Sequence, residues 1–280
     1  MTRQLGIAHL TLLPLTPPEV VDVAAAVGLD FVGLRVHRVT PDEEIADMHP
    51  HSPALHETLS RLRDSEVTVR DIEFLPITAR TTPDDWRGAL ESGALLSASV
   101  FTVAGADPDR SRLIDTLGRL CEEAAGFGIR PALEAISYQS VATVAEAAAI
   151  ARAAGAALML DPLHIQRSGS SIDDVAALEA DLVPVVQLCD APAELGADDD
   201  DARRYEARRH RLLVGEGELP LAELLAAVPA DVPVSLEVPN EHLRETLSAT
   251  EFAARNVRAA RELLDRTDAA ASNAEGDRDA

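Results

Sequence analysis

The chain has 280 residues, of which 46% are hydrophobic and only 3% aromatic, and its formal net charge is −23 at pH 7. This charge argues against a nucleic-acid partner, which needs a basic surface. All 25 basic residues are arginine, so a lysine Schiff base is excluded, and with it the aldolase and pyridoxal routes.

The sequence carries no sign of a membrane segment or of a disulfide framework. No apolar run approaches the roughly 20 residues that span a bilayer, and the first residues lack the features of a signal peptide. The two cysteines, Cys121 and Cys189, fall on a predicted helix and a predicted strand and are interpreted as core residues. We therefore expect a cytoplasmic protein with reduced cysteines and no membrane partner.

Strand-like apolar runs alternate with helix-like segments along the chain. The strands are predicted at residues 5–13, 28–35, 67–73, 99–103, 131–134, 157–161, 182–188 and 232–237. The helices are predicted at residues 17–27, 53–64, 83–96, 109–127, 141–154, 172–179, 220–228 and 243–264. Pro17 suits the first turn of the first helix, and Gly128 and Gly155 suit the positions just after two others.

This order of elements predicts the fold class. Strict alternation implies parallel strands joined by right-handed crossovers. Eight units of about 30 residues fit an α/β protein built as a single (β/α)8 TIM barrel better than an open doubly wound sheet. No Gly-x-Gly-x-x-Gly motif follows the first strand, which argues against a dinucleotide-binding fold. We expect one barrel domain, residues 1–266, followed by a disordered acidic tail at 267–280.

Oxygen-bearing side chains stand at the ends of the last four predicted strands. They are Glu134, Asp161, Gln187 and Glu237. Because the carboxyl ends of barrel strands meet at one face, we expect these side chains to share one mouth. Three carboxylates and an amide oxygen make a hard site, suited to Mg, Mn or Co, and a cation would relieve the repulsion among the acids. The competing interpretation is that such acids cap helices or pair with arginines.

Further polar residues near the same face are candidates for the chemistry. His164, three residues after Asp161, is a candidate acid or base beside the metal. Arg211 precedes a Val-Gly-Glu-Gly turn and can bind a carboxylate, a phosphate or another oxyanion. The arginines just before it are interpreted as a solvated helix face: Arg203, Arg204, Arg208 and Arg209. Candidates for the substrate-binding wall are Asp190, Glu73, Arg70, His9 and Arg35.

These motifs resemble those of the xylose isomerase-like barrel superfamily, and more narrowly the sugar phosphate isomerase/epimerase group, over nearly the whole chain. The resemblance rests on Glu134, on the Asp-Pro-Leu-His step at 161–164, on Gln-Leu-Cys-Asp at 187–190 and on the run 211–221. In that family, strand-end residues of strands five to eight bind one divalent ion. The resemblance implies that Glu134, Asp161, Gln187 and Glu237 hold such an ion, with His164 beside it.

The sequence departs from the family pattern at two positions. Many epimerases and inosose dehydratases carry histidine at the position of Gln187. Glutamine there is similar to the 3-dehydroshikimate dehydratases, which share the Asp-x-x-His step. The second departure is Val214, where the family usually has proline before Gly-x-Gly.

The resemblance and the acids together predict a divalent-metal-dependent sugar (phosphate) isomerase or epimerase acting on a small polyhydroxylated keto substrate. Proton abstraction next to the carbonyl would pass through a metal-stabilised enediolate. Glu134 and Glu237 would move the proton with help from His164, and Arg211 would fix an anionic or oxygen-rich end of the substrate.

Other functions remain open at this point. A dehydratase of the 3-dehydroshikimate or inosose type is the alternative, because expulsion of a β-hydroxyl group would use the same enediolate. An apurinic endonuclease-like enzyme would share the barrel, but it would need several metal ions and a basic surface. A barrel that binds sugar without turnover is the third class. The family often forms dimers or tetramers, so a homo-oligomer is a further expectation, although no exposed apolar stripe demands one.

Overall fold

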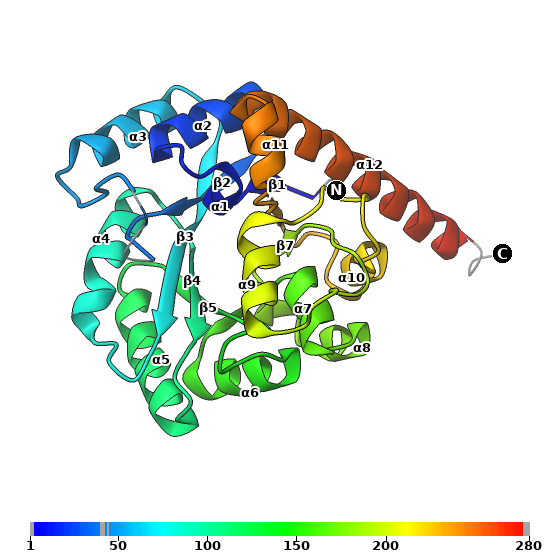
Figure 1. Ribbon diagram of the computed structural model, residues 1–280. Helices are drawn as coiled ribbons and strands as arrows, with labels where there is room; N and C mark the ends of the chain where they lie inside the picture. The colour runs from blue at the N-terminus through cyan, green and yellow to red at the C-terminus, as the bar shows by residue number, and fades with distance from the viewer. Residues whose placement is uncertain (1–2, 40–42, 44, 277–280) are drawn as a thin grey trace.

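The computed structural model describes residues 3–39, 43 and 45–276 and shows eight parallel strands closed into a barrel (Figure 1). The strands are β1 (Leu5–Ile7), β2 (Phe31–Arg35), β3 (Thr68–Ile77), β4 (Val100–Gly105), β5 (Arg130–Glu134), β6 (Ala157–Leu160), β7 (Val185–Leu188) and β8 (Val234–Leu236). Each strand pairs with the next one in the chain, and β8 pairs with β1. The predicted single (β/α)8 TIM barrel is confirmed.

Helices occupy the connections between the strands and follow the last strand. They are α1 (His9–Leu12), α2 (Pro17–Ala26), α3 (Pro53–Arg63), α4 (Arg87–Leu95), α5 (Arg110–Ala125), α6 (Val144–Ala154), α7 (Pro162–Ser168), α8 (Ile172–Ala176), α9 (Asp200–Arg209), α10 (Leu221–Ala227), α11 (Glu241–Thr246) and α12 (Ala249–Gly276). Hydroxyl or carboxylate side chains cap several of them: the Ser52, Asp109 and Thr143 side chains each accept a hydrogen bond from a backbone N–H in the first turn. Among the described helices, none is both long and apolar enough to cross a membrane.

The first strand is shorter than predicted. It ends at Ile7, and α1 follows, although the apolar run continues to Leu13. Every residue of α1 is buried, so hydropathy alone could not separate a buried helix from a buried strand. The Thr11 hydroxyl donates to Leu236 O (2.9 Å) and accepts from the backbone N–H of Val238 (2.9 Å), which ties this turn to the end of β8.

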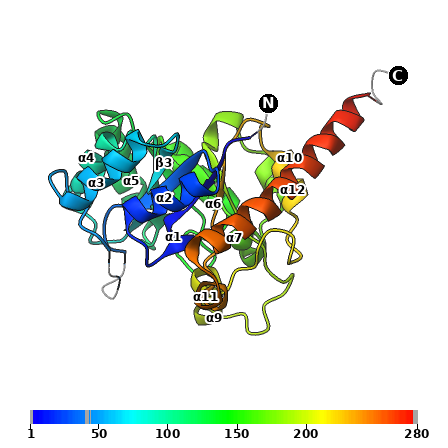
Figure 2. The same cartoon turned by 90° about the horizontal axis from the view of Figure 1, so that it is seen from above.

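The C-terminal helical segment also differs from the prediction. It divides into α11 and α12, because Ser248 and Glu251 form reciprocal capping hydrogen bonds that start a new helix. The backbone of α12 then remains helical to Gly276, past the predicted domain end at 266 and into the segment predicted as a disordered tail. Residues 269–276 include four alanines, the strongest helix formers, and the end of α12 projects away from the barrel (Figures 1 and 2). Residues 277–280 lie outside the described part of the chain.

The barrel interior is apolar at its amino-terminal end. A separate cluster fills it there: Phe31, Val100, Ala132, Ala157, Met159 and Val185, most of them among the first residues of their strands. A larger core of mainly Leu, Val and Ala packs the helices against the strands, consistent with the low aromatic content. Because the amino-terminal half is closed by apolar side chains, buried polar groups gather toward the carboxyl ends of the strands.

Gly33 in β2 stands where the backbone passes close to two acids. A Cβ atom there would lie 2.6 Å from Glu73 Oε1 and 2.8 Å from Asp71 Oδ2. We expect Gly33→Ala to lower the free energy of unfolding by about 1–3 kcal/mol, because neither buried carboxylate can retreat into solvent. Urea unfolding measures this. Gly88→Ala is the control: an added Cβ there meets nothing within 4 Å, and the helix should gain about 0.5–1 kcal/mol. Equal stabilities for the two variants would contradict the predicted crowding.

Candidate active site

The predicted metal ligands lie where their strands end. Glu134 is the last residue of β5, Asp161 directly follows β6 and caps α7 by accepting from Leu163 N–H (2.8 Å), and Gln187 lies within β7. Glu237 directly follows β8. All four side chains are buried. The closed strand order brings residues more than a hundred positions apart in the sequence to one end of the barrel.

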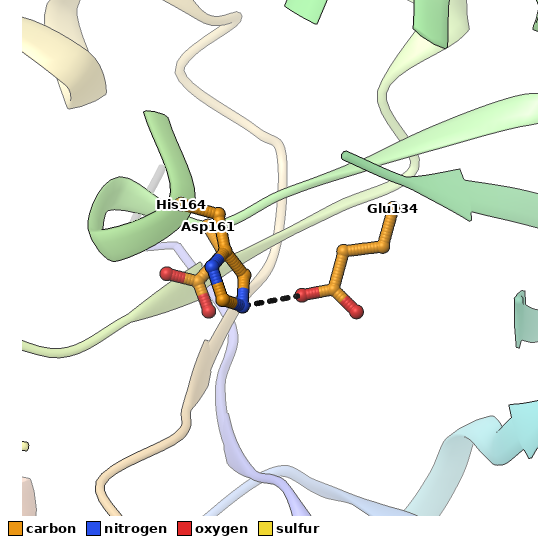
Figure 3. Close-up of side chains that lie close together, drawn as sticks. All are labelled: Glu134, Asp161 and His164. Atoms are coloured by element: carbon orange, nitrogen blue, oxygen red, sulfur yellow. Dashed lines mark ion pairs between the residues drawn. The ribbon is translucent and has the colours of Figure 1, made fainter. Parts of the chain in front are cut away.

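Glu134, Asp161 and His164 form a compact cluster (Figure 3). Each offers one ligand atom, and these atoms lie within 4.8 Å of one another. His164 Nε2 lies 3.9 Å from Glu134 Oε1, while the other ring nitrogen, Nδ1, lies 3.2 Å from the hydroxyl of Ser137. The hydroxyl orients the ring, so that Nε2 faces the acids. The described residues therefore contain a group able to hold a metal ion, with His164 closer to its centre than the sequence suggested.

Gln187 and Glu237, the other two predicted metal ligands, are joined by one hydrogen bond. The Gln187 Nε2 amide donates to Glu237 Oε1 (2.9 Å), which leaves Gln187 Oε1 as the free end of the side chain. That oxygen is buried and has no hydrogen-bond partner among the described residues. A buried acceptor left without a partner costs about 1–3 kcal/mol. Because a hard cation takes amide oxygens as ligands, this orphaned oxygen fits a bound divalent ion.

Arg211 lies between two of the acids. Its side chain is only 2% exposed; Nη1 lies 2.6 Å from Asp161 Oδ2, and Nη2 lies 2.9 Å from Glu237 Oε2. Nε donates to the carbonyl of Ala207 (2.8 Å), which fixes the plane of the guanidinium group. Arg211 was predicted to bind substrate, whereas the structure engages its guanidinium with protein groups. Each carboxylate gives one oxygen to Arg211, while its other oxygen accepts from Leu163 N–H at Asp161 and from the Gln187 amide at Glu237.

The charges at this site favour a bound cation. Burial, followed by the neighbouring Glu237 and Asp161, raises the pKa of Glu134 well above its ordinary value. Burial also raises the pKa of Glu237 to about 7, although Arg211 opposes this shift. The pKa of Asp161 is lowered in spite of burial, because Arg211 and His164 favour the carboxylate. Burial lowers the pKa of His164 to about 4, so the imidazole is neutral at pH 7 and free to act as a ligand or hydrogen-bonding group.

A second pair of acids, Asp71 and Glu73, lies on β3, and Asp71 was not among the predicted site residues. Burial raises the pKa of both side chains to about 7, with further contributions from Glu237 at Asp71 and from Asp71 at Glu73. Among the described residues, the Asp71 carboxylate accepts one hydrogen bond, a long one of 3.5 Å from the Thr102 hydroxyl to Oδ2, and its Oδ1 has no partner. The alternation of Asp71 with Glu73 along the strand is the sequence signal that could have identified it.

Burial of Asp71 lowers the free energy of unfolding by an amount that depends on pH. Its folded pKa of about 7 lies above the ordinary value of 3.8, so its contribution to stability is greatest below pH 3.8 and is lost as the pH rises through 7. We expect Asp71→Asn, which cannot ionise, to be more stable than wild type by about 1–3 kcal/mol at pH 8, with a much smaller difference at pH 4.5. Urea unfolding at both pH values measures this, with the exposed Asp84→Asn as control. A difference independent of pH would point to packing instead of charge.

Two predicted substrate-wall residues lie elsewhere. Arg70 was predicted at the end of β3, but the strand runs from Thr68 to Ile77, so Arg70 lies near its start. Its guanidinium bonds the Gln4 side chain and lies 5.4 Å from the centre of the Phe31 ring, at the amino-terminal end of the barrel. The prediction for Arg70 is therefore wrong. The reason is that the strand continues beyond Glu73, which the sequence did not reveal.

His9 and Asp190 are buried, and their polar atoms bond to backbone groups. The His9 ring accepts the backbone N–H of Arg35 at Nδ1 (3.0 Å), and its Nε2 donates to Leu15 O (2.8 Å). The Asp190 carboxylate accepts from the backbone N–H groups of Ala191, Gly215 and Leu219. These contacts indicate that His9 positions the end of β2 and that Asp190 anchors the loop after β7. The remaining wall candidates, Glu73 and Arg35, line the central cavity.

The central cavity has a volume of about 230 Å³ and is lined by both acidic and basic side chains. Glu73, Glu134, Gln187 and Glu237 line it together with His164, Tyr138, Phe74 and the four arginines Arg35, Arg204, Arg208 and Arg211. Arg204 and Arg208 both line the cavity, and Arg208, 29% exposed, departs from the interpretation as a solvated helix face. Arg204 agrees with that interpretation, since its side chain is 48% exposed and pairs with Asp201. With Ala207 and Arg211, which also line the cavity, the two arginines follow the spacing of one helix face, a signal the sequence contained.

The chain matches one family model and several solved structures. A family model described as xylose isomerase-like TIM barrel matches residues 21–267. Among solved structures, the IolI protein with a bound zinc atom has 16% identity and a TM-score of 0.74, with 94% of this chain and 99% of that chain covered. D-allulose 3-epimerase from Methylomonas sp., in complex with D-allulose, has 16% identity, a TM-score of 0.66 and coverage of 93% and 97%.

A third solved structure is the probable 3-DHS dehydratase AsbF of Bacillus anthracis, with 14% identity, a TM-score of 0.70 and coverage of 93% of this chain and 98% of that chain. At these identities the likeness shows a shared fold. A search of the curated proteins gave no match.

Proposed function

The chain belongs to the xylose isomerase-like TIM barrel family, and we propose that it is a divalent-metal-dependent sugar or sugar phosphate isomerase or epimerase. Such a barrel hosts many functions, so the proposal depends on the site and not on the fold. The observation that carries it is the set of buried acids at the strand ends, which surround the orphaned Gln187 Oε1 and the neutral His164. Solved structures of this fold include a zinc-bound protein and an epimerase in complex with a ketose.

The residues proposed to hold the ion are Glu134, Asp161, Gln187 and Glu237. His164 lies beside them and could replace one of them as a ligand. Mn, Mg or Co would suit this mainly oxygen donor set. When bound, the ion would polarise a substrate carbonyl as a Lewis acid. Arg211 would keep Asp161 and Glu237 in place by holding one oxygen of each.

Glu134 and Glu237 are the proposed proton-transfer residues. Both are buried, and burial raises the pKa of each, that of Glu237 to about 7. A carboxyl group with a pKa near the working pH can both accept and return a proton. Removal of a proton from the carbon next to the carbonyl by one of them, and its return to the other face or to the neighbouring carbon, gives epimerisation or isomerisation. His164, neutral and held by Ser137, would hydrogen-bond a substrate hydroxyl.

Dehydration is the second candidate. One feature in its favour is Gln187 on β7, because glutamine at this position resembles the 3-dehydroshikimate dehydratases. A second is the likeness to the structure of the probable 3-DHS dehydratase. In this reaction the same abstraction breaks a C–H bond. A C=C bond then forms as the β-hydroxyl group leaves with a proton from a carboxyl group, as water.

A substrate panel in D₂O tests the proposal. Ketoses, inososes and 3-dehydroshikimate are incubated with the protein and added Mn, Co or Mg, and the products are identified by NMR. We expect deuterium at the carbon next to the carbonyl of at least one substrate, and only with a divalent ion present. Product identity separates isomerisation from dehydration. If no member of the panel exchanges a proton under any metal condition, the proposed function is refuted.

A further inference from the structure

The Glu43 carboxylate binds donors from three separate places at the central cavity. Arg35 at the end of β2 bonds its Oε1 through Nη1, Arg208 on α9 approaches the same oxygen through Nη2 (3.5 Å), and the Val39 backbone N–H donates to Oε2 (2.8 Å). All three donor residues line the cavity, whereas Glu43 comes from the segment after β2. Two guanidinium groups and an amide directed at one point form an anion-binding site, and an acid of the chain itself fills it.

Arg35 has unused capacity to bind an anion. A guanidinium group has five N–H donors. Arg35 is buried, its Nε has no hydrogen-bond partner among the described residues, and Glu73 Oε2 lies 3.7 Å from that atom. Arg204, on the same helix face as Arg208, pairs with Asp201 (3.0 Å) and lies 5.2 Å from the centre of the Tyr138 ring, beside the cavity. The cavity lining therefore contains, besides the acids, a buried guanidinium group of Arg35 with an N–H donor still unused.

The link between Glu43 and α9 is the weak one. The Arg208 contact of 3.5 Å is at the limit of a hydrogen bond, and the Arg208 side chain is 29% exposed, so this ion pair contributes little. An incoming anionic group would need the same donors, and two anions at one point repel each other. Binding of such a group and retention of Glu43 are therefore alternatives.

We propose that the cavity takes a polyhydroxylated substrate carrying a carboxylate or phosphate group, and that this group competes with Glu43 for Arg35 and Arg208. Glu43 is then a specificity-determining residue. It neutralises the arginines in the free protein and weakens the binding of anionic ligands, whereas the affinity for a neutral sugar does not depend on it. This inference rests on the proposed function, because it concerns the substrate of the same cavity.

Calorimetric binding to the full-length protein loaded with Mn tests the competition. The probes are D-gluconate, D-glucitol 6-phosphate and D-glucitol, which carry a carboxylate, a phosphate and no charge. If Glu43 occupies the site about nine-tenths of the time, Glu43→Ala tightens binding of an anionic probe by about tenfold and leaves D-glucitol unchanged. Glu43→Gln, which keeps the size of the side chain, should act in the same direction. The charged probe whose affinity increases in the Glu43 variants identifies the preferred anion as a carboxylate or a phosphate.

Matched variants separate the site from general charge effects. Arg208→Gln should weaken anion binding, whereas Arg209→Gln, on the exposed side of α9 and paired with Glu241, should not. Glu57→Ala removes an exposed acid of α3 and should leave all three affinities as they are. Unchanged anion affinity in both Glu43 variants, or equal tightening of D-glucitol, would overturn the inference. The probes carry no ketone or aldehyde, so a failure of turnover in the substrate panel leaves this binding result intact.

Discussion

Glu237→Gln is expected to lower turnover by about 10²- to 10⁴-fold, the usual contribution of a group that transfers a proton. The substitution keeps the size of the side chain, but the amide offers one acceptor oxygen where the carboxylate offers two, to Gln187 Nε2 and to Arg211 Nη2. It removes the charge that the proposed ion needs and the group whose pKa of about 7 suits proton transfer. We therefore expect the bound metal content, measured by mass spectrometry after dialysis, to fall together with turnover.

The control for this variant is Glu241→Gln, four residues later in the chain. Glu241 lies at the start of α11 and pairs with Arg209 at the surface, so its loss should alter neither metal content nor turnover. Full activity in Glu237→Gln would refute its assigned role. Loss of turnover with normal metal content would restrict Glu237 to proton transfer and leave ion binding to the other acids.

Arg211→Met is expected to have the largest effect on stability. Asp161 and Glu237 would lose their shared counter-ion while remaining buried, and removal of one partner from a buried ion pair costs about 3–5 kcal/mol. Because a bound divalent cation would neutralise the same two carboxylates, saturating Mn should restore a large part of this loss. Urea unfolding with and without Mn measures both quantities.

Arg209→Met is the matched control for Arg211→Met. It removes an exposed guanidinium group, so its effect should stay below about 1 kcal/mol with or without Mn. If Arg211→Met is equally destabilised in saturating Mn and in its absence, the cation does not bind at Asp161 and Glu237, and the proposed ligand set is incorrect.

The sequence was most informative where strand ends determine position. Eight strand–helix units imply a barrel, and a barrel implies that Glu134, Asp161, Gln187 and Glu237 converge, because every carboxyl end lies on one face. His164 followed from its distance to Asp161 along α7. These inferences need only the order of elements and the direction of the strands.

Side chains whose place depends on strand length or on a long connection were not predictable in the same way. Arg70 was assigned to the wrong end of the barrel because β3 extends to Ile77. The depth of Arg211 between two acids depends on the path of the chain after α9, which no local pattern encodes. Asp71 was missed because an acid in the middle of a strand is unusual, and burial at a functional site is one of the few settings that retains it.

The division of the cavity between strands and α9 has a consequence for how such a protein diversifies. The acids stand on strands held by a neighbour on each side, whereas Arg204 and Arg208 belong to one helix in the connection between β7 and β8. Connections tolerate change better than the strands that they join. Exchange of the α9 segment is thus a route by which a lineage can acquire a new ligand preference while inheriting its reaction chemistry intact.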